Sequence, residues 1–299
     1  MRVFVTGASG WIGSALVAEL LAAGHDVVGL ARSDTSAAAV TAAGAQVHRG
    51  GLDDLDALHQ AAAGSDGVVH TAFKHDIAFT GDFQGAADAD QRAIEAMGEA
   101  LKGSDRPLVI ASGLLGLRPG AVATEDFSPD PSSSPRMGTE QRTLALASQG
   151  VRSSAVRLSP TVHGDGDHGF MSTLVQIARD RGFSAYLGDG ANRWPAVHRL
   201  DAAHLFRLAL EKAPAGSALH GVSEEGVTTR VIAEAISRGL GLPVRSIAPD
   251  DAERHFGWIG ALFGMDSPAS SAITRDLLAW TPTHQGLIAD LDEGHYFSA

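Results

Sequence analysis

The sequence predicts an α/β protein in which helices cover both faces of a doubly wound parallel sheet. Short apolar runs of strand length alternate with helical segments along the first two thirds of the chain, as is typical of parallel sheets. A glycine-rich turn joins the first apolar run to the first helix. With 299 residues the chain can bury the core of one large domain or of two smaller ones.

The glycine-rich turn lies between a strand predicted at 3–5 and a helix predicted at 14–23. In Gly7-x-x-Gly10-x-x-Gly13, the first glycine allows a tight turn, the second lets the backbone approach a pyrophosphate, and the third lets the helix pack closely on the strand. The N-terminus of the helix attracts the anion. This order predicts a Rossmann-type dinucleotide site. Its predicted residues are Thr6, Gly7, Ser9, Gly10, Trp11, Ile12 and Gly13.

The composition is ordinary for a globular protein, with 44% hydrophobic and 19% charged residues. The net charge of −12 argues against a nucleic-acid or acidic-membrane partner. The absence of cysteine excludes disulfides, thiolate catalysis and cysteine-bound metals. No apolar run reaches transmembrane length and no signal peptide precedes the first strand, so we expect a cytoplasmic protein without a membrane partner.

The second strand, predicted at 25–32, ends where such proteins usually select between NAD and NADP. An acidic residue at this point binds the ribose 2′-hydroxyl and repels a 2′-phosphate. In this chain the strand ends with Arg32 and Ser33, and the nearest acid, Asp34, follows the turn. A guanidinium and a hydroxyl both suit a phosphate. We therefore expect NADP(H) as the cofactor; the alternative is that Arg32 is only a solvated loop cation.

The fourth strand places the next candidates at the sheet edge that carries the glycine turn. A short helix at 37–43, a strand at 46–49 and a helix ending at 63 precede it. Ligands bind at the carboxyl ends of strands in open α/β sheets. We therefore expect Leu52 at the cofactor. The residues after the strand predicted at 68–72 are expected in the wall of the cofactor or substrate site: Phe73, Lys74, His75 and Asp76. For Lys74 and His75, an ordinary exposed loop is the alternative.

The fifth strand, predicted at 107–112, follows a long helix at 88–102 with apolar residues at helical spacing. It ends in Ser112, whose hydroxyl can polarise a substrate carbonyl, and Leu114 continues the predicted substrate wall. An acidic loop rich in proline and serine leads to a helix at 136–148 and a strand at 151–158. We expect this loop to cross the mouth of the site.

The second half of the chain is expected to build a smaller, interleaved C-terminal lobe for the substrate. Helices are predicted at 171–181, 201–212, 229–239, 249–263, 271–279 and 285–293, and the last strand of the sheet at 218–222. We divide the chain into an NADP-binding Rossmann domain (1–162 and 196–222) and a substrate lobe (163–195 and 223–299). The carboxylates beside His168 match no metal-site spacing, so no metal is expected.

Several motifs together resemble a known family. They are Thr6-Gly7-x-x-Gly10-x-x-Gly13, Val69-His70-Thr71-Ala72, Ser112-Gly113, Arg157-Leu158-x-Pro160-x-Val162-His163-Gly164, Trp194-Pro195-Ala196-Val197-His198-Arg199-Leu200-Asp201 and Leu277-Leu278-Ala279-Trp280-Thr281-Pro282. With these motifs, the sequence resembles the extended short-chain dehydrogenase/reductases of the NAD(P)-dependent epimerase/dehydratase group.

The resemblance implies positions for the cofactor and the substrate. Thr71 and Ala72 would line the nicotinamide ribose, and the backbone of Pro160, Thr161 and Val162 would lie beside the nicotinamide. The loop with Arg193 and Trp194 resembles the segment that faces the substrate in the family. The family often dimerises through the helices here predicted at 88–102 and 136–148, so we expect a homodimer.

The chain departs from the family at the catalytic signature. The usual Tyr-x-x-x-Lys should open the helix after the fifth strand, where the tyrosine exchanges a proton with the substrate. By spacing, Met137 takes the tyrosine position and Gln141 the lysine position. Methionine cannot transfer a proton, whereas glutamine can still hydrogen-bond a ribose. The sequence is thus similar to the atypical subgroup without this pair, and the family's acid/base mechanism cannot be carried over.

Other residues are therefore candidates for the missing role. Ser112 can polarise a carbonyl, and Arg136 can bind an anionic group or an oxyanion. Tyr186 falls in the substrate-side segment, and histidines titrate near neutral pH. The candidate proton donors are Tyr186, His163, His75, His168 and His198.

Three functions follow from these observations. The first is an NADPH-dependent reductase of a small carbonyl or imine-like compound, with Tyr186, His163 or water as proton donor. The second is a protein that binds NADP(H) as a sensor or regulator without turnover, which the missing Tyr–Lys pair suggests. The third is an epimerase or dehydratase, which normally needs an acid/base pair.

Overall fold

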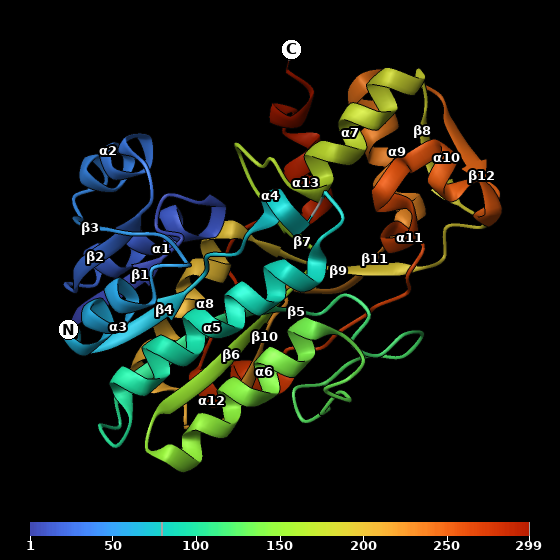
Figure 1. Ribbon diagram of the computed structural model, residues 1–299. Coiled ribbons are helices and arrows are strands. Elements are labelled where there is room, and N and C mark those ends of the chain that lie inside the picture. The colour runs from blue at the N-terminus through green and yellow to red at the C-terminus, as the bar shows by residue number, and fades with distance from the viewer. Residues whose placement is uncertain (79, 299) are drawn as a thin grey trace.

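A seven-stranded parallel sheet forms the centre of the structure, a computed structural model that describes residues 1–78 and 80–298 (Figure 1). The strand order is β10-β6-β5-β4-β1-β2-β3. The strands are β1 (Arg2–Thr6), β2 (Asp26–Ala31), β3 (Gln46–Arg49), β4 (Gly67–His70), β5 (Pro107–Gly113), β6 (Arg152–Leu158) and β10 (Ser217–Gly221). This confirms the predicted doubly wound sheet.

The direction of winding reverses between β1 and β4. These two strands pair with each other in parallel, yet the chain runs outward from β1 to β3 on one side and from β4 to β10 on the other. A crevice for ligands forms at such a reversal, outside the carboxyl ends of the strands. The glycine-rich turn follows β1 at this point.

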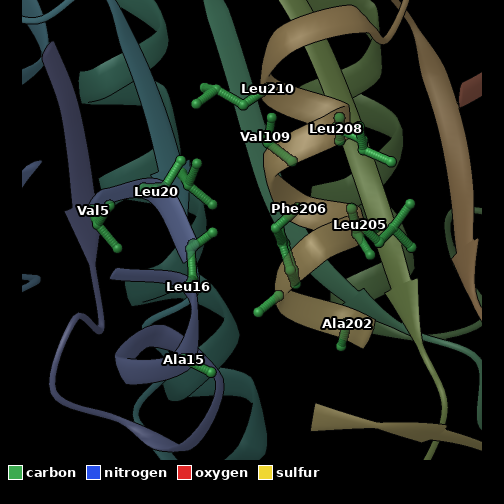
Figure 2. Close-up of a cluster of buried hydrophobic side chains, with 14 of the residues drawn as sticks. Val5, Ala15, Leu16, Leu20, Val109, Ala202, Leu205, Phe206, Leu208 and Leu210 are labelled. Atoms are coloured by element: carbon green, nitrogen blue, oxygen red, sulfur yellow. The ribbon is translucent and has the colours of Figure 1, made fainter. Parts of the chain in front are cut away.

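Helices cover both faces of the sheet. On one face lie α1 (Trp11–Ala22), α2 (Asp34–Ala42) and α8 (Arg199–Lys212); on the other lie α3 (Leu55–Ala63), α5 (Phe83–Leu101) and α6 (Pro135–Ala145). Figure 2 shows Leu16 and Leu20 of α1 facing Phe206 of α8 above the strands. Each fully buried side chain of this kind contributes roughly 1.5–3 kcal/mol by leaving water.

A second core holds the rest of the chain together. The smaller sheets are β11-β9-β7 (Glu224–Thr228, Arg193–His198, Thr161–His163) and β12-β8 (Val244–Ile247, Ser184–Leu187). The helices around them are α7 (Phe170–Arg181), α9 (Thr229–Leu240), α10 (Ala252–Phe256), α11 (Gly260–Phe263) and α13 (Leu287–Asp292). Most of their apolar side chains form a second cluster, whereas Val197 of β9 and Val162 of β7 pack into the core with α1 and α8.

The structure differs from the sequence predictions mainly in this second core. The helix predicted at 249–263 is broken at Gly257, whose φ is +63°, into α10 and α11 with short 3-10 turns. The strands of the small sheets, apart from the residues of β7 and β9 noted for their motifs, were not predicted. A short helix, α4 (His75–Ala78), follows β4.

The C-terminal segment contributes to both cores. Trp280, which follows α12 (Ala272–Leu278), is 1% exposed and packs into the cluster of α1 and α8. Its indole N–H donates to the backbone oxygen of Asp201 at 3.1 Å. Leu287, Leu291 and Tyr296 belong to the second core. Within the described residues, no helix combines the length and the hydrophobicity needed to span a membrane.

Candidate cofactor and active site

Two glycines of the glycine-rich turn, Gly7 and Gly13, lie where a side chain has no room. Gly7 has φ +70°, and a Cβ there would lie 2.8 Å from the backbone nitrogen of Ala72 and from Oγ1 of Thr71. A Cβ on Gly13 would lie 2.0 Å from the Gly7 carbonyl oxygen. The turn thus lies against the end of β4, and α1 begins in direct contact with it. This is the cradle that a pyrophosphate needs.

The N-terminus of α1 has no side-chain cap. Its N-cap residue is Gly10, whereas α2 and α3 are capped by the side chains of Ser33 and Asp54. The first N–H groups of a helix need an acceptor, and a phosphate supplies one together with charge that the helix dipole favours. The turn and the uncapped helix therefore fit a dinucleotide. Ser9 and Gly10 are exposed here, and Ile12 packs partly into the core.

Trp11 joins the turn to the smaller sheets. Its indole N–H donates to the Val162 carbonyl of β7 at 2.9 Å, the guanidinium of Arg199 lies 4.2 Å from the ring centre, and His168 packs edge-on at 5.6 Å. Val162 and His168 thus lie beside the first turn of α1. Thr161 points elsewhere, since its hydroxyl donates to the Pro195 carbonyl at 2.5 Å.

Cations and carboxylates alternate at the ends of β2 and β3. Arg32 is exposed and its guanidinium lies 3.4 Å from the Asp76 carboxylate. Arg49 and Lys74 pair with Asp34 and Asp53 at 2.8 and 2.6 Å. Ser33 already uses its hydroxyl to cap α2, and Leu52 packs against the core under α3 and α5. The exposed Arg32 is thus available to a phosphate, with an acid beside it.

A chain of buried hydrogen bonds fixes the ends of β1 and β4. Oγ1 of Thr6 lies 2.7 Å from Nδ1 of His70, and Nε2 of His70 lies 2.9 Å from the Asp90 carboxylate on α5. Thr71 donates to the Thr6 carbonyl at 2.8 Å, and the Ala72 N–H donates to the Thr6 hydroxyl at 3.3 Å. In the sequence, His70 stands out only as part of a motif, because no local pattern links it to Asp90.

Ser112 lies on the same face of the sheet as this chain. It shares that face of β5 with Leu108 and Ile110, which pack under α3 and α5. It is 5% exposed, and among the described residues its hydroxyl has no hydrogen-bond partner. A buried hydroxyl without a partner costs about 1–3 kcal/mol. Such an atom at the carboxyl edge of the sheet is suited to bind a ligand.

Arg136, at the start of α6, reaches the strand that carries Ser112. Its Nη2 donates to the Ala111 carbonyl at 2.8 Å, and its guanidinium lies 4.3 Å from the centre of the Phe73 ring. His75 packs edge-on against the same ring at 5.1 Å. Burial, and then the charge of Arg136, lower the pKa of His75. The structure thus brings together Phe73 and His75 after β4, Ser112 at the end of β5 and Arg136 at the start of α6.

Met137 and Gln141, predicted by spacing at the tyrosine and lysine positions, cannot act as acid or base. Met137 is 6% exposed and packs with Leu114, Leu117 and Val222 in an apolar cluster. Leu114, expected in the substrate wall, is 1% exposed, so it is a core residue. Gln141 follows Met137 by one helical turn and is half-buried. Proton transfer by this helix is therefore ruled out at these two positions.

Three expected site residues make contacts within the smaller sheets and the C-terminal segment. Tyr186 is in β8, where Arg230 lies 5.6 Å from its ring, on the far side of the small sheets from the glycine turn (Figure 1). Trp194 is a core residue with no exposed surface, and Arg193 is held by the Asp266 carboxylate at 2.9 Å. Trp194 thus belongs to the second core, and the Arg193 guanidinium is already paired.

Two candidate histidines of the predicted motifs, His163 and His198, make side-chain contacts within the protein. His163 has no exposed surface and its Nδ1 lies 2.9 Å from the Asp290 carboxylate of α13. His198 caps α8 by accepting from the Leu200 N–H at 3.2 Å, and it stacks on His284 at 4.6 Å. Burial, and then the neighbouring histidines, lower the pKa of His198.

Comparison with known proteins agrees with this geometry. Residues 3–112 match the model of the NAD dependent epimerase/dehydratase family. The chain is 49% identical over 298 residues, 99% of this chain and 100% of the relative, to an uncharacterized protein of Schizosaccharomyces pombe. It is 29% identical over 259 residues to a 2-alkyl-3-oxoalkanoate reductase of Stenotrophomonas maltophilia, covering 83% of this chain and 73% of the relative.

The fold is also that of solved structures. The UDP-glucose 4-epimerase of Thermus thermophilus, solved in complex with NAD, superposes with a TM-score of 0.76 at 20% identity, and the match covers 100% of both chains. The relative over the whole chain, the family match across the glycine turn and the shared sheet lead to one conclusion. The chain belongs to the NAD-dependent epimerase/dehydratase family.

Proposed function

We propose that the protein is an NADPH-dependent reductase of a small carbonyl compound. The observation that carries this proposal is the Ser112 hydroxyl, which is buried without a partner among the described residues, at the sheet edge where the glycine turn would hold a dinucleotide. The oxoalkanoate reductase of S. maltophilia, named for a carbonyl reduction, adds support. The alternative of an imine substrate is compatible with the same hydrogen bond.

The choice of NADP(H) over NAD(H) rests on Arg32. Arg32 lies between the end of β2 and Ser33, the N-cap residue of α2. Its side chain is exposed, and its guanidinium lies 3.4 Å from the Asp76 carboxylate, which is long for an ion pair. A 2′-phosphate bound to Arg32 would replace Asp76 as its partner and accept two hydrogen bonds from the guanidinium, which is a stronger contact. The turn from Gly7 to Gly13 would hold the pyrophosphate, and Thr71 and Ala72 would lie beside the nicotinamide ribose.

The side chains of the site have separate tasks in the reaction. When bound, NADPH supplies a hydride to the carbonyl carbon of the substrate. The Ser112 hydroxyl donates a hydrogen bond to the carbonyl oxygen and stabilises the negative charge that develops there. The proton that completes the alcohol comes from water, because Met137 cannot give one and His163 is buried against Asp290. The products are the alcohol and NADP⁺.

The proposal is tested by NADPH oxidation, followed by the loss of its near-ultraviolet absorbance, with a panel of aldehydes, ketones and oxo acids. We expect turnover with at least one class, and we expect Ser112→Ala to lower kcat by about 10²-fold while the Kd for NADP⁺ is kept. Ser65→Ala is the matched control, because Ser65 is also 5% exposed but precedes β4 at the opposite edge of the sheet. Tight NADPH binding without turnover on any substrate would contradict the proposal.

A second function is favoured by the apolar cluster around Met137. Met137, which takes the tyrosine position by spacing alone, is part of a core with Leu114 and Val222. A protein that only senses the redox state of NADP(H) needs no such group. This function predicts a clear difference between the Kd values for NADP⁺ and NADPH, measured by calorimetry, and no turnover.

A further inference from the structure

We infer that Arg136 binds a carboxylate of the substrate, so that the substrate class is an oxo acid whose acid group lies close to the reacting carbonyl. This inference rests on the proposed carbonyl reduction and adds the chemical class of the substrate to it. It rests on which polar and charged groups on one face of the sheet already have partners and which do not.

Four neighbouring strands place polar side chains on this face, and most of them satisfy one another. Thr6, His70 and Asp90 form the hydrogen-bond chain under the glycine turn. Arg157, directly beside Ser112 in the register of β5 and β6, donates to Oε1 of Glu140 at 2.9 and 2.7 Å. The second oxygen of Glu140 also has no partner among the described residues, but a carboxylate oxygen repels an anionic ligand. Ser112 and Arg136 are the groups left for binding.

The guanidinium of Arg136 is fixed but not neutralised by an ion pair. The Ala111 carbonyl and the Phe73 ring hold it in place, and no described carboxylate forms an ion pair with it. The two acids that face it, Asp90 and Glu140, are bound to His70 and Arg157. Burial lowers the pKa of Arg136, as expected for a cation withdrawn from water. An anionic ligand would restore this lost solvation.

Arg136 also lies in the first turn of α6, where the helix dipole opposes a positive charge. An anion bound to the guanidinium interacts favourably with the charge of Arg136 and with the helix dipole. The independent second observation is the Ser112 hydroxyl, which is buried at 5% exposure and has no partner among the described residues. Ser112 directly follows Ala111, whose carbonyl accepts a hydrogen bond from Arg136.

The short separation favours a carboxylate over a diphosphate. Because Arg136 binds the carbonyl of Ala111, its guanidinium lies within one residue of Ser112 along β5. A 2-oxo or 3-oxo acid carries its two oxygen groups at this kind of spacing. In a sugar nucleotide, the width of the sugar separates the diphosphate from the reacting carbon, so the same arginine would not reach both.

The test compares a charged ligand with its neutral counterpart on the protein saturated with NADP⁺, where no reduction takes place. Acetoacetate and methyl acetoacetate differ by the charge of one group, and isothermal titration calorimetry gives their Kd values. We expect acetoacetate to bind at least tenfold more tightly than the ester. Equal affinity, or no binding of the acid, would overturn the inference without the use of any variant.

Two arginine variants locate the effect. Arg136→Met should abolish the preference for the acid, and Arg136→Lys should keep part of it, with the Kd for NADP⁺ unchanged in both. Arg142→Met is the matched control, because Arg142 is on the same helix, is exposed and contacts Gln91. A preference that survives in Arg136→Met, or tight Arg136-dependent binding of UDP, would refute the assignment of a carboxylate to this residue.

Turnover separates this inference from the proposed function. If NADPH is oxidised equally fast with neutral ketones and oxo acids, the carboxylate site is refuted and the reductase stands. If acetoacetate binds through Arg136 but no carbonyl compound is reduced, the reductase is refuted, and the anion site remains as that of a sensor.

Discussion

Acidification should destabilise the protein through His220, a histidine of β10 with no exposed surface. Its Nδ1 lies 2.8 Å from the Ser270 carbonyl, so this nitrogen carries the proton and donates. Its Nε2 lies 3.3 Å from Nη1 of Arg157 and accepts from it. A second proton on the ring would face this guanidinium. Burial, and then the charge of Arg157, lower the pKa of His220 from 6.5 to about 4.

The sign of the effect follows from which state binds the proton first. The unfolded chain takes it up near pH 6.5, whereas the folded protein resists down to about pH 4. Stability is therefore complete above the unfolded pKa and is lost as the pH falls through this window. At about 1.4 kcal/mol per unit, the full loss is roughly 3 kcal/mol, of which about 2 kcal/mol is lost by about pH 5.

Urea unfolding followed by circular dichroism at about pH 7.5 and about pH 5 measures this loss. His220→Asn keeps a donor toward Ser270 but does not titrate, so its free energy of unfolding should fall by about 2 kcal/mol less than that of the wild type between the two pH values. His59→Asn, at an exposed position of α3, is the control and should behave as the wild type. Equal losses in His220→Asn and the wild type would refute the reasoning.

Three further substitutions test the site and its support. Gly13→Ala places a Cβ 2.0 Å from the Gly7 oxygen, so we expect at least tenfold weaker NADP⁺ binding by calorimetry and a loss of about 1–3 kcal/mol in urea unfolding; unchanged values would contradict the close packing. Arg32→Ala should weaken NADPH binding about tenfold and leave NADH binding unchanged, and a parallel loss of both would argue against a phosphate contact. Glu140→Gln leaves the buried Arg157 without a counterion and should cost about 3–5 kcal/mol in urea unfolding, whereas a loss below about 1 kcal/mol would show that the pair is not needed.

The large sheet could be predicted because its signals are local. Apolar runs, the glycines of the turn and the helix boundaries depend on neighbouring residues, so strands such as β3 and helices such as α8 were found within a few positions. The glycine turn also follows from local sterics, since its φ at Gly7 and its contact at Gly13 are properties of a short segment. The small sheets depend on distant pairings such as β7 with β9, which no local pattern reveals.

The site was predicted only in part because function depends on what each side chain contacts. Ser112 and Arg136 were found as residue types at a strand end and a helix start. That Ser112 lacks a partner among the described residues, while Arg157 beside it has Glu140, is a tertiary property. Tyr186 and His163 were candidates by chemistry; in the structure Arg230 lies near the Tyr186 ring and Asp290 lies within hydrogen-bond distance of His163.

The C-terminal segment has a consequence for how the chain is made. Trp280 completes the packing of α1 and α8, although α1 leaves the ribosome long before it. Leu287 and Leu291 then complete the second core. Domains generally fold as units during synthesis, beginning at the N-terminus. Here neither core is complete until these late residues emerge, so a chain that stops before Trp280 lacks packing residues of both cores.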